Sequence, residues 1–431
     1  VIISIGINNA GELHNVFWWL HLFTILGFGI YIPLSKHMHI IASPLSFVFR
    51  DLQPMGTLST PKNLETLEVF GASKPENFTW KELLDSYACA ICGRCTESCP
   101  AHITGKSLSP MHIVQNLKTG LSGMTRDANN DQERHPSPLI GSLISEDALW
   151  DCLTCGACEQ ECPVGVEHID SIVDMRRNLV MEQAKMPASA TNALTSMEQR
   201  GHPWRGTPYN RTDWTAGLDI KTLAQHPSAE VLFWVGCNNA LEKRNHSIAR
   251  SMVSILNRAK VDFAILGEEE ACTGDPARRL GNEYLYQTMA RQNIDTMTQY
   301  DVKKIITTCP HCFNVIKNEY PHLGGQYNVL HYSEFVADLI EQGKIAPKLK
   351  TDETVSYHDS CYLGRHNGIY DQPRRLLNTI PGLEIIEMGR CKDKGFCCGA
   401  GGGHMWIEES GGKRINKERI EEFVGTGAST L

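Results

Sequence analysis

The sequence of 431 residues has no block of basic residues, and its beginning has neither the charged segment nor the cleavage site of a signal peptide. Its 41 Lys and Arg residues stand against 49 Asp and Glu residues, a net charge of −8. Nucleic acid is therefore not expected as a partner, because phosphate binding needs clustered Lys and Arg. The composition also excludes collagen-like, disordered and coiled-coil classes. The chain begins with Val1, and we expect it to start inside a longer protein.

One long stretch near the N-terminus has no charge. Residues 13–35 include no Asp, Glu, Lys or Arg, and about 20 apolar residues suffice for a helix to cross a bilayer. Lys36 and Arg50 follow the stretch, so the positive-inside rule places the later part of the chain on the cytoplasmic side of the inner membrane. The stretch predicts one membrane crossing.

Two histidines in this region stand in helical register. His21 and His39 are 18 residues apart (39 − 21), which is five turns of 3.6 residues, so one continuous helix would place both imidazoles on the same side. Ionisable groups in a spanning helix are costly and indicate function, and two stacked histidines suit two haems b. The partner ligands would lie on other transmembrane helices, which we expect upstream of Val1. The alternative is that His21 is an ordinary interfacial residue and that His37 and His39 are solvated contacts with lipid headgroups.

Eight of the 16 cysteines form two identical runs, Cys-x2-Cys-x2-Cys-x3-Cys-Pro. This is the bacterial signature for two [4Fe–4S] clusters, in which three cysteines of one run hold a cluster and the fourth crosses to the other. The predicted ligand sets are Cys89, Cys92, Cys95 with Cys162, and Cys152, Cys155, Cys158 with Cys99. A zinc ribbon is the alternative, but it uses two CxxC pairs rather than this doubled run. We expect the section to be mainly α-helical.

Beyond a linker rich in Gly and Pro, short apolar runs alternate with helical stretches. The apolar runs are residues 231–235, 261–266, 304–308 and 354–358. Strands that alternate with helices predict an α/β section with parallel sheets covered on both faces.

Most of the remaining cysteines form a repeat within this section. Cys237, Cys272, Cys309 and Cys312 make up the first copy, and Cys361, Cys397 and Cys398 stand at matching places of the second. The repeat projects a second CxxC pair just beyond Leu431. We therefore expect the chain to stop short, with residues 429–431 beginning the strand that would deliver this pair. Cys391 has no counterpart and is expected to be a plain residue.

At these positions the sequence resembles the CCG domain of the heterodisulfide reductase family, most specifically at residues 270–279 and 396–403. The parts follow one another as a terminal helix of a NarI-like haem b domain, a dicluster ferredoxin and two CCG domains. This order resembles the membrane-bound, heterodisulfide-reductase-like iron–sulfur oxidoreductases, which include electron-transfer-flavoprotein:menaquinone oxidoreductases. The resemblance implies that His21 and His39 are haem ligands.

The resemblance has different implications for the two copies. In the second copy, Cys361, Cys397 and Cys398 with the projected CxxC pair would hold a non-cubane iron–sulfur cluster, and these three are the predicted catalytic residues. In the first copy, Thr273 replaces the second Cys of CCG. Its four thiolates suffice for an ordinary [4Fe–4S] cluster, and the alternative is a vestigial copy that serves as a scaffold.

The sequence has no convincing flavin or nicotinamide site. Residues 399–403 are not a dinucleotide fingerprint because no strand precedes them, and close backbone approach to a cluster explains these glycines better. The two-electron donor is therefore expected to be another protein.

Three functions follow as hypotheses. In the first, a soluble electron-transfer flavoprotein reduces a CCG-domain cluster, and electrons pass through the ferredoxin clusters and haem b to menaquinone. The second is a heterodisulfide or dithiol reductase that is linked to the quinone pool through the non-cubane cluster. The third, from a different class, is a zinc-stabilised scaffold without redox function.

The expected division of the chain has six parts. They are the last transmembrane helix of the haem b domain (1–50), a linker (51–78), the helical two-[4Fe–4S] ferredoxin domain (79–199), a second linker (200–228), the first CCG domain with its degenerate CTG (229–348), and the second CCG domain, whose C-terminus is missing (349–431).

Overall fold

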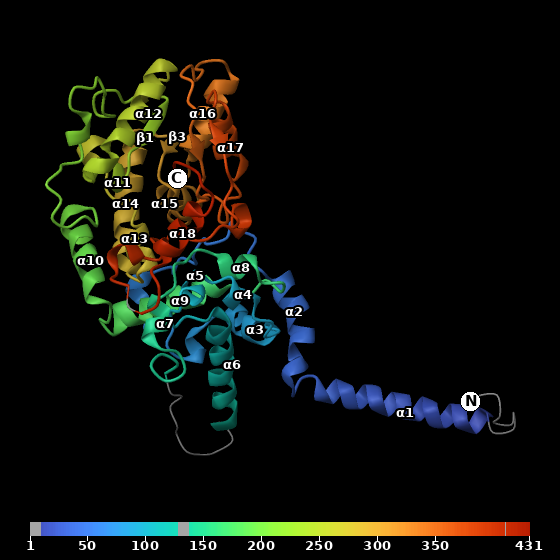
Figure 1. Ribbon diagram of the computed structural model, residues 1–431. Helices are drawn as coiled ribbons and strands as arrows, with labels where there is room; N and C mark the ends of the chain where they lie inside the picture. Colours follow the sequence, from blue (N-terminus) through green and yellow to red (C-terminus); the bar gives the residue numbers. More distant parts are fainter. Residues whose placement is uncertain (1–9, 128–137, 410) are drawn as a thin grey trace.

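A computed structural model describes residues 10–127, 138–409 and 411–431 (Figure 1). Figure 1 shows the α/β part of the chain on top of the helical section that contains the two cysteine runs. The N-terminal helix α1 (Ala10–Tyr31) extends away from both.

Helix α1 has the properties of a membrane-spanning segment. Among the described residues it is the one helix that is long and apolar enough to cross a membrane, over Gly11–Tyr31. Its large apolar side chains are exposed, among them Trp18, Trp19 and Phe23. A helix that is apolar on all sides needs lipid or other protein around it.

The expected alignment of His21 and His39 on one side requires one continuous helix, and the structure interrupts that helix. Helix α1 ends at Tyr31, a turn follows, and α2 (His39–Val48) begins at His39 itself. Pro33 lies in the turn, where its ring removes a backbone donor and collides with the preceding helical turn. The two imidazoles do not share one helix face, so the argument from register no longer pairs them.

Helix α2 lies against the helical section rather than in line with α1. It packs on α3 (Trp80–Ala88). The Ser43 hydroxyl donates to the Ala88 carbonyl at 2.8 Å, and the Ser46 hydroxyl donates to the Asp85 carboxylate. These contacts connect the segment after the apolar helix directly to the first cysteine run.

The section with the two cysteine runs is helical, as the sequence pattern predicted. After α3 it contains α4 (Arg94–Glu97), α5 (Pro100–Ile103), α6 (Pro110–Asp127), α7 (Glu146–Trp150), α8 (Ala157–Gln160), α9 (His168–Arg177) and α10 (Ala188–Arg200). Helix α3 begins with a capping box, in which the Thr79 hydroxyl accepts from the Glu82 backbone N–H and the Glu82 carboxylate accepts from the Thr79 N–H at 2.8 Å. The short helices α4 and α8 follow Gly93 and Gly156, whose φ angles of +82° and +74° suit glycine. The two runs therefore have the same local backbone.

The first α/β section contains a four-stranded parallel sheet in the order β2-β1-β3-β4. Its strands are β1 (Val231–Trp234), β2 (Phe263–Ala264), β3 (Lys304–Thr307) and β4 (Asn328–His331), and its helices are α11 (Cys237–Leu241), α12 (His246–Arg258), α13 (Asp275–Arg279), α14 (Glu283–Gln299), α15 (Pro310–Asn314) and α16 (Tyr332–Glu341). Strand β1 is buried along its whole length, as an apolar strand with both faces covered must be. Leu232 is in register with Ala264 on one side and with Ile305 on the other. The carboxyl ends of β1 and β3 thus flank a topological switch point, the usual place for a ligand in such sheets.

The second α/β section repeats the centre of this sheet on a smaller scale. β5 (Thr354–Val355) pairs in parallel with β6 (Glu384–Ile385), and Val355 forms a parallel bridge with Thr430. Its helices are α17 (Asp371–Asn378) and α18 (Ile415–Val424). The bridge lies where the sequence predicted a strand over residues 429–431. β5, like β2, is shorter than the apolar run that predicted it.

The three sections share contacts and part of their core. One apolar cluster joins Leu149 and Ile172 of the helical section to Leu232 of the sheet. We expected the glycines at 399–403 to approach a cluster; two of them, Gly401 and Gly402, approach the backbone of the second cysteine run. A Cβ atom at Gly402 would lie 2.3 Å from the Cys152 carbonyl oxygen, so only glycine fits there.

Candidate metal centres

The first predicted ligand set is Cys89, Cys92, Cys95 and Cys162, and the structure brings these four thiols together. Burial raises the pKa of Cys89, and the thiols of Cys162 and Cys92 raise it further. Burial also raises the pKa of Cys95 to about 11, with contributions from the same neighbours. Charges act on one another in this way only at close range. Cys162 of the second run therefore lies with three cysteines of the first.

The second predicted set is Cys99, Cys152, Cys155 and Cys158, and it lies deeper in the molecule. Burial raises the pKa of Cys158, and Glu159 and the three other thiols of the set raise it further. Cys99 is 6% exposed and Cys152 is 6% exposed. Here too the fourth cysteine of one run lies with the first three of the other.

Both runs contain a residue with unusual backbone at the same place. Ile91 has a φ of +58° and Thr154 a φ of +49°, and each precedes the second cysteine of its run. Left-handed backbone is strained for a branched side chain and costs of order 1–3 kcal/mol. The repeated strain indicates a loop whose shape is set by the need to aim three thiols at one point.

The third group of thiols lies at the switch point of the first sheet. Cys237 follows β1, and Cys309 and Cys312 follow β3, so the neighbouring strands deliver them to the same edge. The Cys237 thiol lies close to that of Cys272, and the Cys309 thiol to that of Cys312. A Cβ atom at Gly236 would lie 3.6 Å from the Cys312 sulfur. All four thiols that the sequence assigned to the first copy therefore meet.

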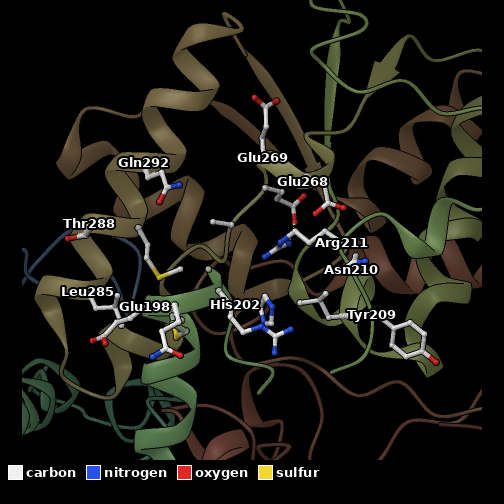
Figure 2. A pocket seen from close by; sticks show the side chains of 18 residues that line it. Glu198, His202, Tyr209, Asn210, Arg211, Glu268, Glu269, Leu285, Thr288 and Gln292 are labelled. Atoms are coloured by element: carbon white, nitrogen blue, oxygen red, sulfur yellow. Dashed lines mark hydrogen bonds and ion pairs between the residues drawn. The ribbon is translucent and has the colours of Figure 1, made fainter. Parts of the chain in front are cut away.

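Arg211 also contacts this group, although no sequence motif marks it. Its guanidinium donates to the Cys237 sulfur at 3.2 Å and to the Glu270 carboxylate at 2.8 Å. Glu270 in turn accepts from the backbone N–H of Val235 and of Gly236, each at 2.9 Å. Arg211 also lines a pocket of about 550 Å³ (Figure 2). Its position in a stretch that reads as a linker hid this role.

The fourth group is Cys361, Cys397 and Cys398, from the second copy. The Cys397 thiol lies close to those of Cys361 and Cys398, and it shares a buried cluster with Cys155 of the second cysteine run. This group thus contacts the second ferredoxin-type group directly. Cys391 lies apart, near the Asp359 carboxylate and other charged side chains.

Two buried arginines, Arg176 and Arg365, bear on whether an anionic cofactor fits these groups. Arg176 has no exposed surface and donates to backbone carbonyls that include those of Leu149 and Cys152, at 2.6 and 2.7 Å. Arg365 donates to the Cys155 carbonyl at 2.9 Å. Neither forms an ion pair with any carboxylate in the part of the chain that the structure describes. An unpaired buried cation is costly, and an iron–sulfur cluster with its thiolates supplies the missing negative charge.

The spacing of the thiols also bears on the kind of metal. Within residues 10–127, 138–409 and 411–431, no three His, Cys, Asp or Glu side chains gather tightly enough to hold a single metal ion. A zinc site needs four ligands about 2.3 Å from one point when they are thiolates. A cluster with several irons instead takes each thiolate on a different metal. The two Cys-x2-Cys-x2-Cys-x3-Cys-Pro runs are typical of the second arrangement.

The two predicted haem ligands are placed as follows. His21 lies exposed on α1. His39 is half-buried at the start of α2, with its Nδ1 3.0 Å from the Lys36 carbonyl oxygen. Their role as haem ligands remains a prediction from the resemblance.

Comparison with known families gives two matches. The cysteine-rich CCG domain matches residues 231–317 and again residues 355–431. The 4Fe-4S dicluster domain matches residues 88–167. The ferredoxin-type section followed by two CCG domains, which the sequence predicted, is confirmed by these matches and by the parallel sheets.

The curated relatives agree with these matches. The chain is 40% identical to the "Probable iron-sulfur-binding oxidoreductase FadF" of Bacillus subtilis, over 99% of this chain and 66% of the relative. It is 41% identical to the "EtfAB:quinone oxidoreductase" of Syntrophomonas wolfei, over 95% of this chain and 62% of the relative. It is 30% identical to one subunit of the dihydromethanophenazine:CoB--CoM heterodisulfide reductase of Methanosarcina mazei, over 83% of this chain and 88% of the relative. The chain thus spans less than two thirds of the length of the first two. It belongs to the CCG-domain iron–sulfur oxidoreductases of the heterodisulfide reductase type.

Proposed function

We propose that this chain carries the iron–sulfur sites of a membrane-bound oxidoreductase that passes electrons from an electron-transfer flavoprotein to menaquinone. The observation that carries the proposal is the proximity of Cys155 and Cys397, which belong to one buried cluster and so place a ferredoxin-type group next to a CCG group. Electron transfer between clusters requires such proximity. The relative named EtfAB:quinone oxidoreductase supports the flavoprotein and the quinone as partners.

The proposed ligands are the four thiol groups described above. One [4Fe–4S] cluster would be held by Cys89, Cys92, Cys95 and Cys162, and a second by Cys99, Cys152, Cys155 and Cys158. A third [4Fe–4S] cluster would be held by Cys237, Cys272, Cys309 and Cys312. A non-cubane cluster would be held by Cys361, Cys397 and Cys398 with further ligands. When bound, such clusters carry single electrons. The chain's own residues fix their positions and adjust their potentials, since N–H···S bonds such as that of Arg211 and buried positive charge favour the reduced form.

The flavoprotein side of the proposal rests on the first CCG domain. Cys309 is half-buried and lines a mainly apolar cleft of about 510 Å³ together with Ile248, Met252 and Tyr332. The cleft opens at the carboxyl ends of β1 and β3, so a redox group placed in it would come close to the third thiol group. We propose that the flavoprotein docks over this cleft.

The membrane side of the proposal rests on α1. Its length and composition suit a bilayer crossing, and we propose that it is the last helix of a NarI-like domain, with the iron–sulfur domains on the cytoplasmic side of the inner membrane. His21 and His39 would be axial ligands of haem b, and helices upstream of Val1 would complete the site. The domain boundaries given from the sequence belong to the same proposal.

A rapid-mixing experiment tests the proposal. Purified protein in detergent is mixed with reduced electron-transfer flavoprotein, and the absorbance of iron–sulfur clusters and haem is followed. We expect both to bleach on the timescale of turnover with menaquinone. Absence of reduction by the flavoprotein, in protein that dithionite reduces fully, would contradict the proposal.

A variant in the cleft refines this test. Ile248, which is 46% exposed, is replaced by Glu, and the exposed Tyr284 of α14 is replaced by Glu as a control outside the cleft. We expect Ile248→Glu to slow reduction by the flavoprotein several-fold and to leave reduction by dithionite unchanged. Equal rates of reduction by the flavoprotein in the two variants would show that the flavoprotein does not dock over the cleft.

The second candidate function is a heterodisulfide or dithiol reductase linked to the quinone pool. The observation that favours it is the likeness to a heterodisulfide reductase subunit over most of both chains. Under this function, protein would oxidise a dithiol with reduction of quinone, and Cys397→Ser would abolish the reaction. Flavoprotein oxidation without dithiol oxidation selects the first candidate.

A further inference from the structure

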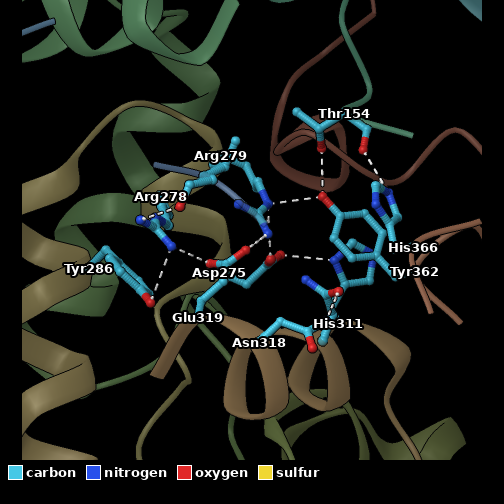
Figure 3. A network of polar contacts seen from close by, with 12 residues as sticks. Thr154, Asp275, Arg278, Arg279, Tyr286, His311, Asn318, Glu319, Tyr362 and His366 are labelled. Carbon is cyan, nitrogen blue, oxygen red and sulfur yellow. Dashed lines mark hydrogen bonds and ion pairs between the residues drawn. The ribbon is translucent and has the colours of Figure 1, made fainter. Parts of the chain in front are cut away.

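Tyr362 lies among Thr154, Arg279 and His311, which come from different cysteine-bearing sections (Figure 3). It directly follows Cys361 in the chain and is 1% exposed. Its ring stacks on that of His311, with the ring centroids 4.0 Å apart and 27° between the planes. His311 lies between Cys309 and Cys312, so the ring of Tyr362 is next to the first CCG group.

The hydroxyl of Tyr362 points to a different group. Its oxygen is 2.7 Å from the Thr154 hydroxyl oxygen, and Thr154 lies between Cys152 and Cys155. The same oxygen accepts a hydrogen bond from Arg279 Nε at 2.9 Å. Because a guanidinium can only donate, the hydrogen of the Tyr362 hydroxyl is free to be donated to Thr154. One side chain thus connects the first CCG group to the second ferredoxin-type group.

The surroundings hold this side chain in place. Arg279 forms ion pairs with Glu319 and, at 3.3 Å, with Asp275. Asp275 also lies 2.9 Å from Nδ1 of His311. Both partners of the Tyr362 ring are therefore anchored by the same buried charges, as Figure 3 shows. Such a network keeps the stacked rings and the hydroxyl contact in one geometry.

We propose that Tyr362 is the bridge for electron transfer between the first CCG site and the ferredoxin-type site of Cys152 and Cys155. The proposal rests on the function proposed above, because it requires a cluster at both ends. One electron leaves the iron at one end and the same electron is gained by the iron at the other, while Tyr362 keeps its proton and its oxidation state. The Cys397–Cys155 contact serves the second CCG site separately, so the two CCG sites converge on one ferredoxin-type site.

Conservative substitutions at the two ends of one hydrogen bond test the bridge. Tyr362→Phe keeps the stacked ring and removes the hydroxyl, and Thr154→Val removes the hydroxyl from the other end. The matched control is Tyr286→Phe, since Tyr286 is also fully buried and its hydroxyl lies 3.5 Å from Arg278. Iron content and the spectra of the reduced clusters establish that each variant has assembled.

The measurement follows an electron injected by flash photoreduction of a deazaflavin, which replaces the flavoprotein. Rapid-freeze electron paramagnetic resonance then records how fast the electron moves from the first CCG site to the ferredoxin-type site. We expect Tyr362→Phe and Thr154→Val each to slow this step several-fold and Tyr286→Phe to leave it unchanged. The double variant should be no slower than the slower single variant, because both changes remove the same contact.

Three results would overturn the bridge. They are a wild-type rate in Tyr362→Phe, an equal loss in Tyr286→Phe, and a double variant that multiplies the two single effects. If Thr154→Val fails to assemble its cluster, the comparison of the two Tyr→Phe variants decides alone. Because the electron is injected without flavoprotein, failure of the bridge is distinguishable from failure of the flavoprotein as donor.

Discussion

Arg176 connects the three cysteine-bearing sections through backbone carbonyls. It donates to the carbonyls of Leu149, Trp150 and Cys152 in the helical section, of Arg279 in the first CCG domain and of Gly402 in the second. These carbonyl groups surround the guanidinium in the interior of the protein. No other side chain has as many donors in one plane to replace it. Arg176 is therefore expected to stabilise the packing of the sections on one another.

We predict that Arg176→Lys destabilises the protein strongly. An ammonium group cannot reach all five carbonyls, and each buried acceptor left without a donor costs about 1–3 kcal/mol. The measurement is the midpoint of chemical unfolding, with Arg250→Lys as the control. Arg250 is half-buried and donates to the carbonyls of Trp214 and Ala216 at 2.7 and 2.9 Å. Equal shifts of the midpoint in the two variants would contradict the role of Arg176.

At the residue scale, the sequence predicted some side chains of the candidate site and not others. Cysteine ligands were predictable because the spacing within each run is local and is repeated. Arg176, Arg211 and Tyr362 were not, because their partners lie far away in the chain and no spacing marks them. These side chains become buried, and reach their partners, only when the sections pack together.

At the scale of elements, the glycine run of the second CCG domain determines how closely that domain approaches the second cysteine run. Gly402 has a φ of +62°, and a Cβ atom there would lie 2.3 Å from the Cys152 carbonyl oxygen. Gly427 has a similar φ of +73°, but nothing lies within 4 Å of its position for a Cβ atom. An alanine at Gly427 would therefore have backbone strain alone, whereas an alanine at Gly402 would have the same strain and also collide with Cys152.

We predict that Gly402→Ala costs much more stability than Gly427→Ala. A left-handed alanine alone costs about 1–2 kcal/mol, and Gly402→Ala adds a collision with backbone that cannot move without shifting Cys152. We also expect Gly402→Ala to lose the spectrum of the cluster at Cys152 and Cys155. Equal unfolding midpoints, with that spectrum intact in both variants, would show that the close approach is unimportant.

The beginning of helix α3 should make stability depend on pH. Burial, and to a smaller extent the charge of Asp174, raise the pKa of Glu82 from its usual 4.5 to about 7. The fold therefore favours the protonated carboxyl, so this contribution to stability is complete below pH 4.5 and is lost as the pH rises through 7.

We predict that Glu82→Gln becomes more stable relative to wild type as the pH rises from about 5 to about 8. Glutamine mimics the protonated carboxyl and still serves at this position of a capping box. The measurement is the free energy of unfolding across this range, with Glu76→Gln as the control at an exposed carboxyl. A difference between Glu82→Gln and wild type that does not change with pH would refute the assignment.

The elements themselves were largely predictable, with two exceptions that have physical causes. The apolar runs at 231–235 and 304–308 became β1 and β3, whereas 261–266 and 354–358 gave strands of two residues. The length of an edge strand depends on pairing with neighbouring strands, and the local sequence pattern does not reveal this pairing. The helix in which His21 and His39 would share one side is interrupted at Pro33, because the proline ring removes a backbone donor and collides with the preceding turn.

At the scale of the whole molecule, the order of parts along the chain does not reveal how they meet. The sequence predicted two ferredoxin-type groups and two CCG groups. It did not predict that Cys397 meets Cys155 or that Tyr362 reaches Thr154. These contacts turn separate metal sites into one connected group, and this connection is the physical basis of the proposed electron transfer.

The most direct test of this account is the content of iron, acid-labile sulfide and zinc in the purified chain, measured together with the electron paramagnetic resonance of the reduced protein. The account predicts iron and sulfide in equal amounts, sufficient for at least the two [4Fe–4S] clusters of the ferredoxin-type section, and signals from interacting clusters. Zinc bound to the cysteines, without iron and sulfide, would contradict it.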